Sequence, residues 1–338
     1  MRHRRLLGLA ILLVLATLVS LSLGKYAVSV GEVASFLGRR LLHMQDSDPA
    51  RAALLDNVLL QIRLPRVLAA LIIGAALSTV GASLQAVFTN PLVSPKTMGM
   101  LAGAAFGGVL GVLVAQHWIV VQTLSVVFGF LALGLAVAIS RLCRSDSILM
   151  LVLGGIVSES LFMALTMTAQ YVADPYTKLP AIVHLLMGNL AMADRASVLT
   201  AAIPMVVGTV VLALCGRQLN ALSMGAEEAR ALGIPVGLVR LGLLLVGTLL
   251  TALTVMLGGG FMVGWVGLVI PHAARMITGP NNVVLLPASA LVGGTYLLVM
   301  DDFSRLAFSF ELPIGVVTSL VGIPFFVYVL RNARRSWA

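Results

Sequence analysis

The residues that could do chemistry in this sequence are few, and they lie far apart. Glu159 is a lone carboxylate inside a long apolar stretch, and His272 follows a proline in another. No group of His, Cys and carboxylate residues has the spacing of a metal site, and no nucleophile stands beside a base. A glycine-rich phosphate loop ending in Lys-Ser or Lys-Thr is also absent. The sequence therefore predicts no catalytic residue, no metal site and no cofactor.

Composition indicates what kind of molecule holds these residues. Of 338 residues, 59% are hydrophobic and only 10% are charged, with a mean hydropathy of +1.05, whereas a soluble domain has about 25% charged residues. The apolar residues form continuous runs near the ~20 residues that a helix needs to cross a bilayer, without the alternation of a membrane barrel. We therefore expect an all-α integral membrane protein with a single transmembrane domain over residues 1–338.

Ten apolar runs are predicted to span the membrane. They cover approximately residues 6–23, 64–88, 98–116, 119–140, 147–171, 196–215, 239–257, 262–277, 285–299 and 314–330. The first run lacks a convincing cleavage site, so we interpret it as a retained span rather than a signal peptide. Short basic flanks usually face the cytoplasm, and both termini are placed there. Because the basic residues are dispersed among the span ends, the net charge of +9 does not indicate nucleic-acid binding.

The connections between the spans carry most of the charged residues. The longest, Lys25–Arg66, is expected outside, whereas Lys96 is interpreted as part of a cytoplasmic turn. The last outer segment, Asp301–Glu311, begins with two acids that we interpret as a solvated turn, in which one acid could orient Arg305. The two cysteines both lie next to segments assigned to the cytoplasmic side, so no structural disulfide is predicted.

A loop over residues 217–240 is predicted to hold a short helix on the cytoplasmic side. The core of the loop, Gly225–Pro235, reads Gly-Ala-Glu-Glu-Ala-Arg-Ala-Leu-Gly-Ile-Pro. Glu227 and Glu228 lie in the first turn, where carboxylates are favourable to the helix dipole. Gly233 and the proline that follows supply a stop. The pattern is typical of a short exposed helix.

Six runs along the chain form a pattern more specific than composition. They are Arg63-Leu64-Pro65-Arg66, Gly74 to Gln85, Asn90-Pro91-Leu92, Met224 to Ile234, Gly264 to His272 and Glu311 to Thr318. In order and spacing they resemble the permease subunits of the FecCD family, which import cobalamin, haem and iron-siderophores in ABC transporters. The resemblance implies a homodimer with the pathway along its two-fold axis, two ATPase subunits beneath it and one extracytoplasmic binding protein above it. It also implies a permease of the cell inner membrane that is not itself an enzyme.

The resemblance assigns roles to particular residues. In similar permeases, arginines at the positions of Arg63, Arg66 and Arg305 receive acidic residues of the binding protein, and the alternative is ordinary interfacial anchoring. The segment that resembles a coupling helix, which rests in a groove of the ATPase, contains Gly225, Glu227, Glu228, Arg230, Leu232 and Gly233. Arg230 and Leu232 are its expected contacts. A merely solvated loop helix is the other interpretation.

The fifth span carries the residues expected to face the translocation pathway. Glu159, Met163 and Thr166 share one helical face at i, i+4 and i+7, and in similar permeases this span lines the path. An ionisable residue within a span is costly and usually faces water or the bundle interior. A pathway carboxylate would favour a cationic cargo or disfavour an anionic one; the alternative is a protonated or hydrogen-bonded packing residue. Met163 and Met167 could line the path or fill the core.

These patterns predict an importer subunit that passes an iron-siderophore or a related metal chelate inward by alternating access. A separate ATPase subunit supplies the energy. Haem, cobalamin and molybdate or tungstate are alternative cargoes for the same architecture. A secondary transporter driven by an ion gradient, with Glu159 as the ion site, is the alternative from another class.

Overall fold

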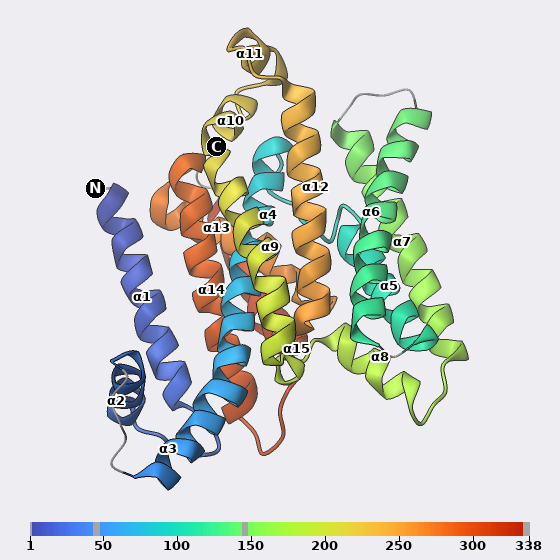
Figure 1. Cartoon of the computed structure of the whole chain (residues 1–338). Helices are drawn as coiled ribbons and strands as arrows, with labels where there is room; N and C mark the ends of the chain where they lie inside the picture. The colour runs from blue at the N-terminus through green and yellow to red at the C-terminus, as the bar shows by residue number, and fades with distance from the viewer. Residues whose placement is uncertain (1, 43–47, 116, 144–147, 334–338) are drawn as a thin grey trace.

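The computed structural model describes residues 2–42, 48–115, 117–143 and 148–333, and within these ranges all regular structure is helical. The long helices are α1 (Arg2–Ser22), α4 (Leu64–Val87), α5 (Met100–Val114), α6 (Trp118–Leu142), α7 (Ile148–Val172), α9 (Arg195–Leu214), α12 (Val236–Thr254), α13 (Val266–Thr278), α14 (Asn282–Leu306) and α15 (Ile314–Ala333). The shorter elements are α2 (Val30–Leu41), α3 (Pro49–Leu55), η1 (Asp56–Arg63), α8 (Lys178–Met187), η2 (Leu190–Met192), α10 (Gly216–Leu222), α11 (Ala226–Ala231), η3 (Val255–Gly259) and η4 (Met262–Trp265). Figure 1 shows α11 at the same end of the molecule as the start of α1, with α2 and α3 at the opposite end.

Each of the ten predicted spans coincides with one of the long helices. Over the described residues, seven helical stretches are long and apolar enough to cross a membrane, on length and composition alone. The apolar stretches at α5, α13 and α15 are shorter, namely Met100–Val114, Met262–Thr278 and Ile314–Tyr328. The predicted all-α class is confirmed for the described part of the chain, and ten crossings stay a prediction.

Helix α4 lies at the centre of the bundle because small residues let its neighbours approach. It packs against α9, α12, α13 and α14, and most of its residues are buried. A Cβ added to Gly74 would fall 2.2 Å from the carbonyl oxygen of Gly293 in α14. A Cβ added to Gly81 would fall 1.7 Å from the carbonyl oxygen of Gly267 in α13. Such close backbone approach supplies the van der Waals packing that holds helices together in lipid.

Helices α5 and α6 pair through a stripe of glycines. Gly103, Gly107 and Gly111 recur every fourth residue and so share one face of α5. A Cβ added to Gly107 would fall 2.1 Å from the carbonyl oxygen of Leu124 in α6. Helix α7 packs against both α5 and α6. These three helices, with α8, form the side of the molecule seen at the right in Figure 1.

The connection between α4 and α5, which was predicted to be a cytoplasmic turn marked by Lys96, folds back into the bundle and packs against α7 and α13. The cytoplasmic placement of this turn stays a prediction. Gly99, at the end of this connection, has a φ of 75° and lies against Gly155 and Ser158, well inside α7. Pro95 packs against Gly267 of α13. Proline and glycine shape a buried connection here, and Lys96 is partly buried as a result.

The last outer segment also differs from the prediction. Helix α14 continues to Leu306, so Asp301 and Asp302 occupy helical positions instead of a solvated turn. Asp301 is completely buried, and Asp302 is only partly exposed. A carboxylate is tolerated in such a place when cations pair with it.

Candidate functional site

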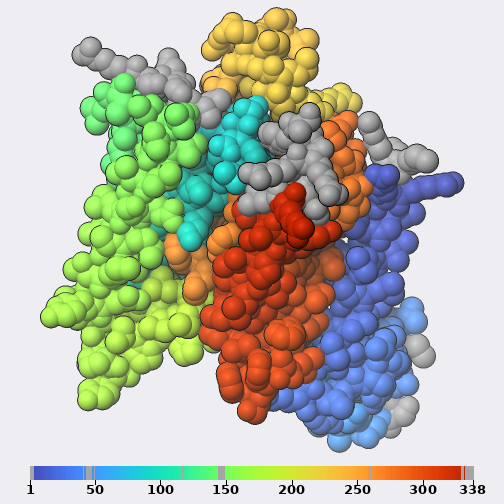
Figure 2. All heavy atoms as spheres, turned by 180° about the vertical axis from the view of Figure 1, so that it is seen from behind, coloured from blue at the N-terminus to red at the C-terminus, as the bar shows by residue number. Residues whose placement is uncertain are grey.

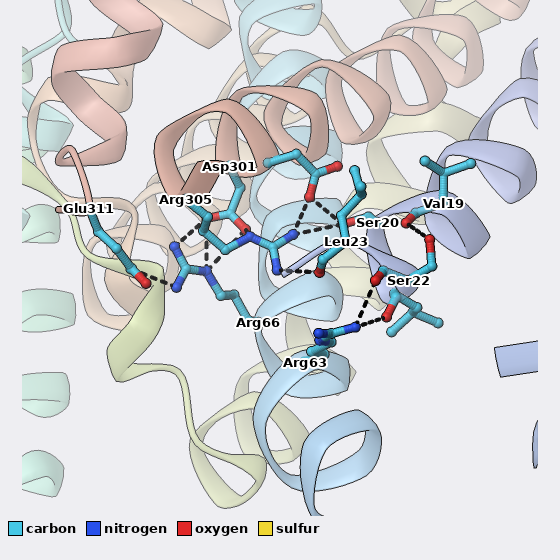
Figure 3. A network of polar contacts seen from close by, with 11 residues as sticks. Val19, Ser20, Ser22, Leu23, Arg63, Arg66, Asp301, Arg305 and Glu311 are labelled. Atoms are coloured by element: carbon cyan, nitrogen blue, oxygen red, sulfur yellow. Dashed lines mark hydrogen bonds and ion pairs between the residues drawn. The ribbon is translucent and has the colours of Figure 1, made fainter. Parts of the chain in front are cut away.

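Three arginines predicted for docking come together at the end of the bundle away from α11. Arg63 ends η1, Arg66 lies in the first turn of α4, and Arg305 lies in the last turn of α14. Figure 3 shows Arg66 and Arg305 pointing toward the same carboxylate. We call the set of Arg63, Arg66, Asp301, Asp302, Arg305 and Glu311 the arginine cluster. Its side chains bring three positive and three negative charges together.

Asp301 is the centre of the arginine cluster. Arg66 Nε donates to both of its carboxylate oxygens at 3.0 Å, and Arg305 Nε lies 3.2 Å from Oδ2. The other edge of the Arg66 guanidinium donates from Nη1 to Glu311 Oε2 at 2.8 Å. Charge-assisted contacts of this kind are the strong ones among hydrogen bonds. They tie the start of α4 to the end of α14 and to the segment that follows it (Figure 3).

Arg63 fastens the end of α1. Its Nη1 donates to the carbonyl oxygens of Leu21 at 2.7 Å and Ser22 at 3.0 Å, and its Nη2 donates to the carbonyl of Tyr26. The last carbonyls of a helix lack partners within the helix and form the negative end of its dipole. A guanidinium is therefore well suited to this position.

Arg305 joins α14 to α1. Its Nη2 donates to Ser20 Oγ at 3.0 Å and to Asp302, and Ser20 Oγ in turn donates to Asp302 Oδ1 at 2.6 Å. The prediction that one of the two acids orients Arg305 is confirmed, since both contact its guanidinium.

The arginines are held by internal partners, of which the sequence reasoning foresaw only an acid beside Arg305. Arg63, Arg66 and Arg305 are 4%, 8% and 7% exposed. A cavity of about 190 Å³ borders the cluster and is lined by Arg66, Asp301 and Glu311, among others. Glu311 keeps 37% of its side chain exposed. The partners of Arg63 and Arg66 are distant in sequence and leave no spacing signal, whereas Asp301 and Asp302 lie four and three residues before Arg305. The docking role itself stays a prediction.

Helix α11 is confirmed as a short exposed helix. Gly225, with a φ of 136°, begins it, and Gly233, with a φ of 78°, follows its end. The Gly233 N–H donates to the Arg230 carbonyl at 2.8 Å, and the Ile234 N–H donates to the Ala229 carbonyl at 3.0 Å. These two bonds form a Schellman motif, which satisfies carbonyls that the helix leaves unpaired. Glycine is required because the position takes a positive φ.

The exposed face of α11 combines charge with an apolar side chain. Arg230 pairs with Glu227, and the Glu228 carboxylate lies close to Gly225. Leu232 is 65% exposed. An exposed leucine rimmed by charged residues is a surface suited to a protein partner.

An asparagine network connects α10, which precedes α11, to the start of α14. Asn220 Nδ2 donates to Asn281 Oδ1 at 3.0 Å, and the Asn282 N–H donates to Asn220 Oδ1 at 2.8 Å. Helix α14 is therefore fixed at one end near α11 and at the other end in the arginine cluster. Sequence reasoning missed these residues, because single asparagines in turns are common helix caps.

The predicted pathway face of α7 has a mixed environment. Thr166 is buried, and its hydroxyl donates to the Phe162 carbonyl at 2.8 Å. Met163 and Thr166 line a cavity of about 330 Å³, and Met167 lines it too. Both methionines therefore border a cavity, and Met163 also packs against the core cluster that contains Phe162. Glu159 is partly buried and interacts electrostatically with Lys96.

This α7 cavity lies between several helices that are distant in sequence. Besides α7 it is lined from α8, from the segment that leads into α13, and from α15, with Phe261, Met262 and Trp265 contributing. Figure 2 shows the surface hollowed between the light green α7–α8 region and red α15. His272 is not part of it; its Nε2 lies 3.1 Å from the Pro91 carbonyl oxygen, where it helps to hold the connection between α4 and α5.

Comparison with known proteins decides the class to which this arrangement belongs. Residues 12–332 match the model of the FecCD transport family. The chain belongs to the FecCD family. Its FecCD relatives include the molybdate import system permease protein MolB of Haemophilus influenzae, 37% identical over 98% of this chain and 96% of that protein. A probable iron chelatin transport system permease protein of Helicobacter pylori is 36% identical over 83% of this chain and 84% of that protein.

A solved structure agrees with the FecCD assignment. It is described as an inward-facing conformation of a metal-chelate type ABC transporter, and it superimposes with a TM-score of 0.85 at 36% identity over 97% of this chain and 98% of that one. The predicted resemblance is confirmed, and the relatives are permease subunits of ABC transporters rather than enzymes. Their printed cargoes differ, so FecCD membership alone does not determine the cargo of this chain.

Proposed function

We propose that this FecCD protein is the permease of an ABC importer in the cell inner membrane. It works as a homodimer with two ATPase subunits on the α11 side and one extracytoplasmic binding protein on the side of the arginine cluster. The observation that carries the proposal is that α11 and the arginine cluster lie at opposite ends of a bundle that belongs to a permease family. In this orientation the ten long helices cross the membrane ten times, and both termini face the cytoplasm.

The proposed cargo is an anionic metal compound, either a ferric siderophore or another metal chelate, or an oxyanion such as molybdate. One relative is an iron chelatin permease and another a molybdate permease, which is compatible with both kinds, while others are cobalamin import permeases. Haem and cobalamin, which are also metal chelates, stay alternative cargoes. No chemistry on the cargo is needed, because the chain only has to open a path alternately to each side.

Docking of the binding protein is proposed to involve the arginine cluster. Glu311 is the cluster's most exposed carboxylate and holds the outer edge of Arg66. An acidic side chain of the partner can compete with Glu311 for that edge, while Arg63 and Arg305 hold the surrounding helix ends in place. We expect Glu311→Gln to tighten docking several-fold at low salt, because it removes the competing charge and surface charges are least screened there. Unchanged affinity in a binding assay with the purified partner would count against this role.

Coupling to the ATPase is proposed to run through α11. Leu232 and Arg230 contact the ATPase, and the asparagine network transmits movement of α10 and α11 to α14. Closure of the ATPase subunits then changes the tilt of helices around the α7 cavity, a rigid-body type of switch. FecCD membership favours this ATP-driven scheme over an ion gradient that uses Glu159.

The proposal is tested by ATP hydrolysis of the complex in liposomes. The permease is assembled with its ATPase and binding protein, and ferric siderophore, molybdate, haem and cobalamin are supplied side by side. We expect either the ferric siderophore or molybdate to stimulate ATP hydrolysis several-fold. Absence of stimulation by every cargo, with the binding protein present, would contradict the importer assignment.

A further inference from the structure

Lys96 places an ammonium group in the wall of the α7 cavity. Its stem runs past Gly264, where an added Cβ would meet the Lys96 side chain at 3.6 Å. Its Nζ lies over the ring of Phe261, 5.2 Å from the ring centre. Phe261 and Lys96 both line the cavity of about 330 Å³. The ammonium is therefore directed to the cavity and away from the end of the bundle.

The backbone that carries Lys96 is held in a fixed shape. The Ser94 N–H donates to Thr97 Oγ1 at 2.9 Å, and the Gly99 N–H donates to the Lys96 carbonyl at 2.9 Å. Pro95 packs on one side of the connection, against Gly267 of α13. A site whose backbone is fixed by its surroundings presents its charge with little loss of entropy on binding.

Among the described residues, Lys96 takes part in no ion pair and donates no hydrogen bond. Its contact with the face of Phe261 is a cation–π interaction, which leaves N–H donors free. An ionisable group inside a membrane bundle is costly, and such groups commonly mark substrate or ion pathways. The charge of Lys96 is thus available to a ligand that enters the cavity.

Glu159 limits how strongly an anion can bind there. It lies one turn before Met163 on α7, outside the set of residues that line the cavity, and within electrostatic reach of Lys96. A nearby carboxylate lowers the attraction that an incoming anion feels. Transport requires binding that is favourable enough for entry and weak enough for release.

We propose that Lys96 is the residue of the translocation pathway that contacts anionic oxygen of the cargo, with Glu159 setting the strength of that contact. The anionic oxygen belongs to an oxyanion or to the ligand groups of a metal chelate, and the inference rests on the proposed importer function. The volume is near the lower end of the ~300–1,000 Å³ typical of small-molecule pockets. It accommodates an oxyanion or one end of a chelate. Methionines in the wall can adapt to either shape.

The charge of the cavity can be measured without knowing the cargo. Met163→Cys is made in a chain with Cys143→Ser and Cys215→Ser, assembled with its ATPase in nanodiscs. The labelling rates of an anionic and a cationic methanethiosulfonate reagent are compared with Lys96 present and in Lys96→Gln. We expect Lys96→Gln to lower the anionic-to-cationic rate ratio about tenfold, Lys96→Arg to preserve it, and Glu159→Gln to raise it. An unchanged ratio in Lys96→Gln, or no labelling of Met163→Cys, would overturn the proposal.

Uptake measurements distinguish whether the anionic oxygen that Lys96 contacts belongs to an oxyanion or to a metal chelate. Uptake into liposomes by the complete complex is measured with molybdate, with a ferric catecholate chelate and with cobalamin, and Arg141→Gln at the end of α6 serves as the charge-matched control. Lys96→Gln is expected to reduce uptake of the anionic cargo at least tenfold, with Lys96→Arg and the control close to the unaltered chain. Full uptake of that cargo by Lys96→Gln refutes the proposal. If the unaltered complex carries none of the probes, the importer proposal fails, whereas the labelling ratio still decides the role of Lys96.

Discussion

At the scale of single residues, Asp301 determines how the arginine cluster is built. A completely buried carboxylate between Arg66 and Arg305 has lost its hydration, so its stability depends on both cations. Removing one partner of a buried ionic group leaves an uncompensated charge, which costs more than the pair contributes. Sequence reasoning placed Asp301 in solvent because two consecutive acids near a span end resemble a polar turn. The contacts that bury it come from α4, more than two hundred residues earlier.

Substitution of Asp301 tests this view of the cluster. Asp301→Asn keeps the shape but leaves two buried guanidiniums without their shared anion, and we expect a loss of about 3–5 kcal/mol in stability. Glu311→Gln is the matched control, because its side chain is partly exposed, and it is expected to cost at most about 1 kcal/mol. Thermal unfolding of the two variants in detergent measures the difference. Equal unfolding temperatures for both variants would be inconsistent with Asp301 as the centre.

At the scale of elements, glycine pairs determine how closely the helices approach. The run from Gly74 to Gln85 was recognisable in the sequence as part of a motif, and the structure gives its physical reason. Gly74 and Gly81 face glycines of α14 and α13 at distances that exclude any side chain. Which helix each glycine faces was not predictable, because apolar periodicity around α4 is lost when nearly every face is buried.

The contact between α4 and α13 is tested by adding a single methyl group. Gly81→Ala places a Cβ against the Gly267 carbonyl, and overpacking of this kind costs about 1–3 kcal/mol or more. Gly134→Ala on α6 is the control, since an added Cβ there meets nothing within 4 Å. We expect Gly81→Ala to unfold at a lower temperature and Gly134→Ala to equal the unaltered chain. A stable, active Gly81→Ala would contradict the close packing of these helices.

The proposed contact between α11 and the ATPase is tested by placing a charge at Leu232. Leu232→Asp is expected to weaken association with the ATPase on the order of tenfold, because a carboxylate replaces an apolar contact at the centre of the interface. Leu42→Asp, an equally exposed leucine near the opposite end of the bundle, is the control. Co-purification of the ATPase at increasing dilution gives both affinities. A loss in Leu42→Asp of the same size would remove the special role of α11.

At the scale of the whole molecule, the sequence predicted where the helices lie better than it predicted which residues are buried and what they contact. All ten long helices were found, because apolar runs of span length carry a strong signal, and α11 was found from its glycines and proline. The inward fold of the α4–α5 connection was not found, since Lys96 between two spans resembles an ordinary basic turn. Met163 and Thr166 were predicted to face the pathway from their place on one face of α7, and the structure shows that they line a cavity. Their role in a pathway stays a prediction.

We propose that this chain passes an anionic metal compound inward only when ATP is hydrolysed by its partner. The most direct measurement is uptake of ferric siderophore or molybdate into liposomes that contain the complete complex, with ATP or with an ion gradient as the sole energy source. We expect accumulation with ATP, none with the gradient alone, and a loss of accumulation in Leu232→Asp. Accumulation driven by the gradient without ATP, and abolished by Glu159→Gln, would contradict it.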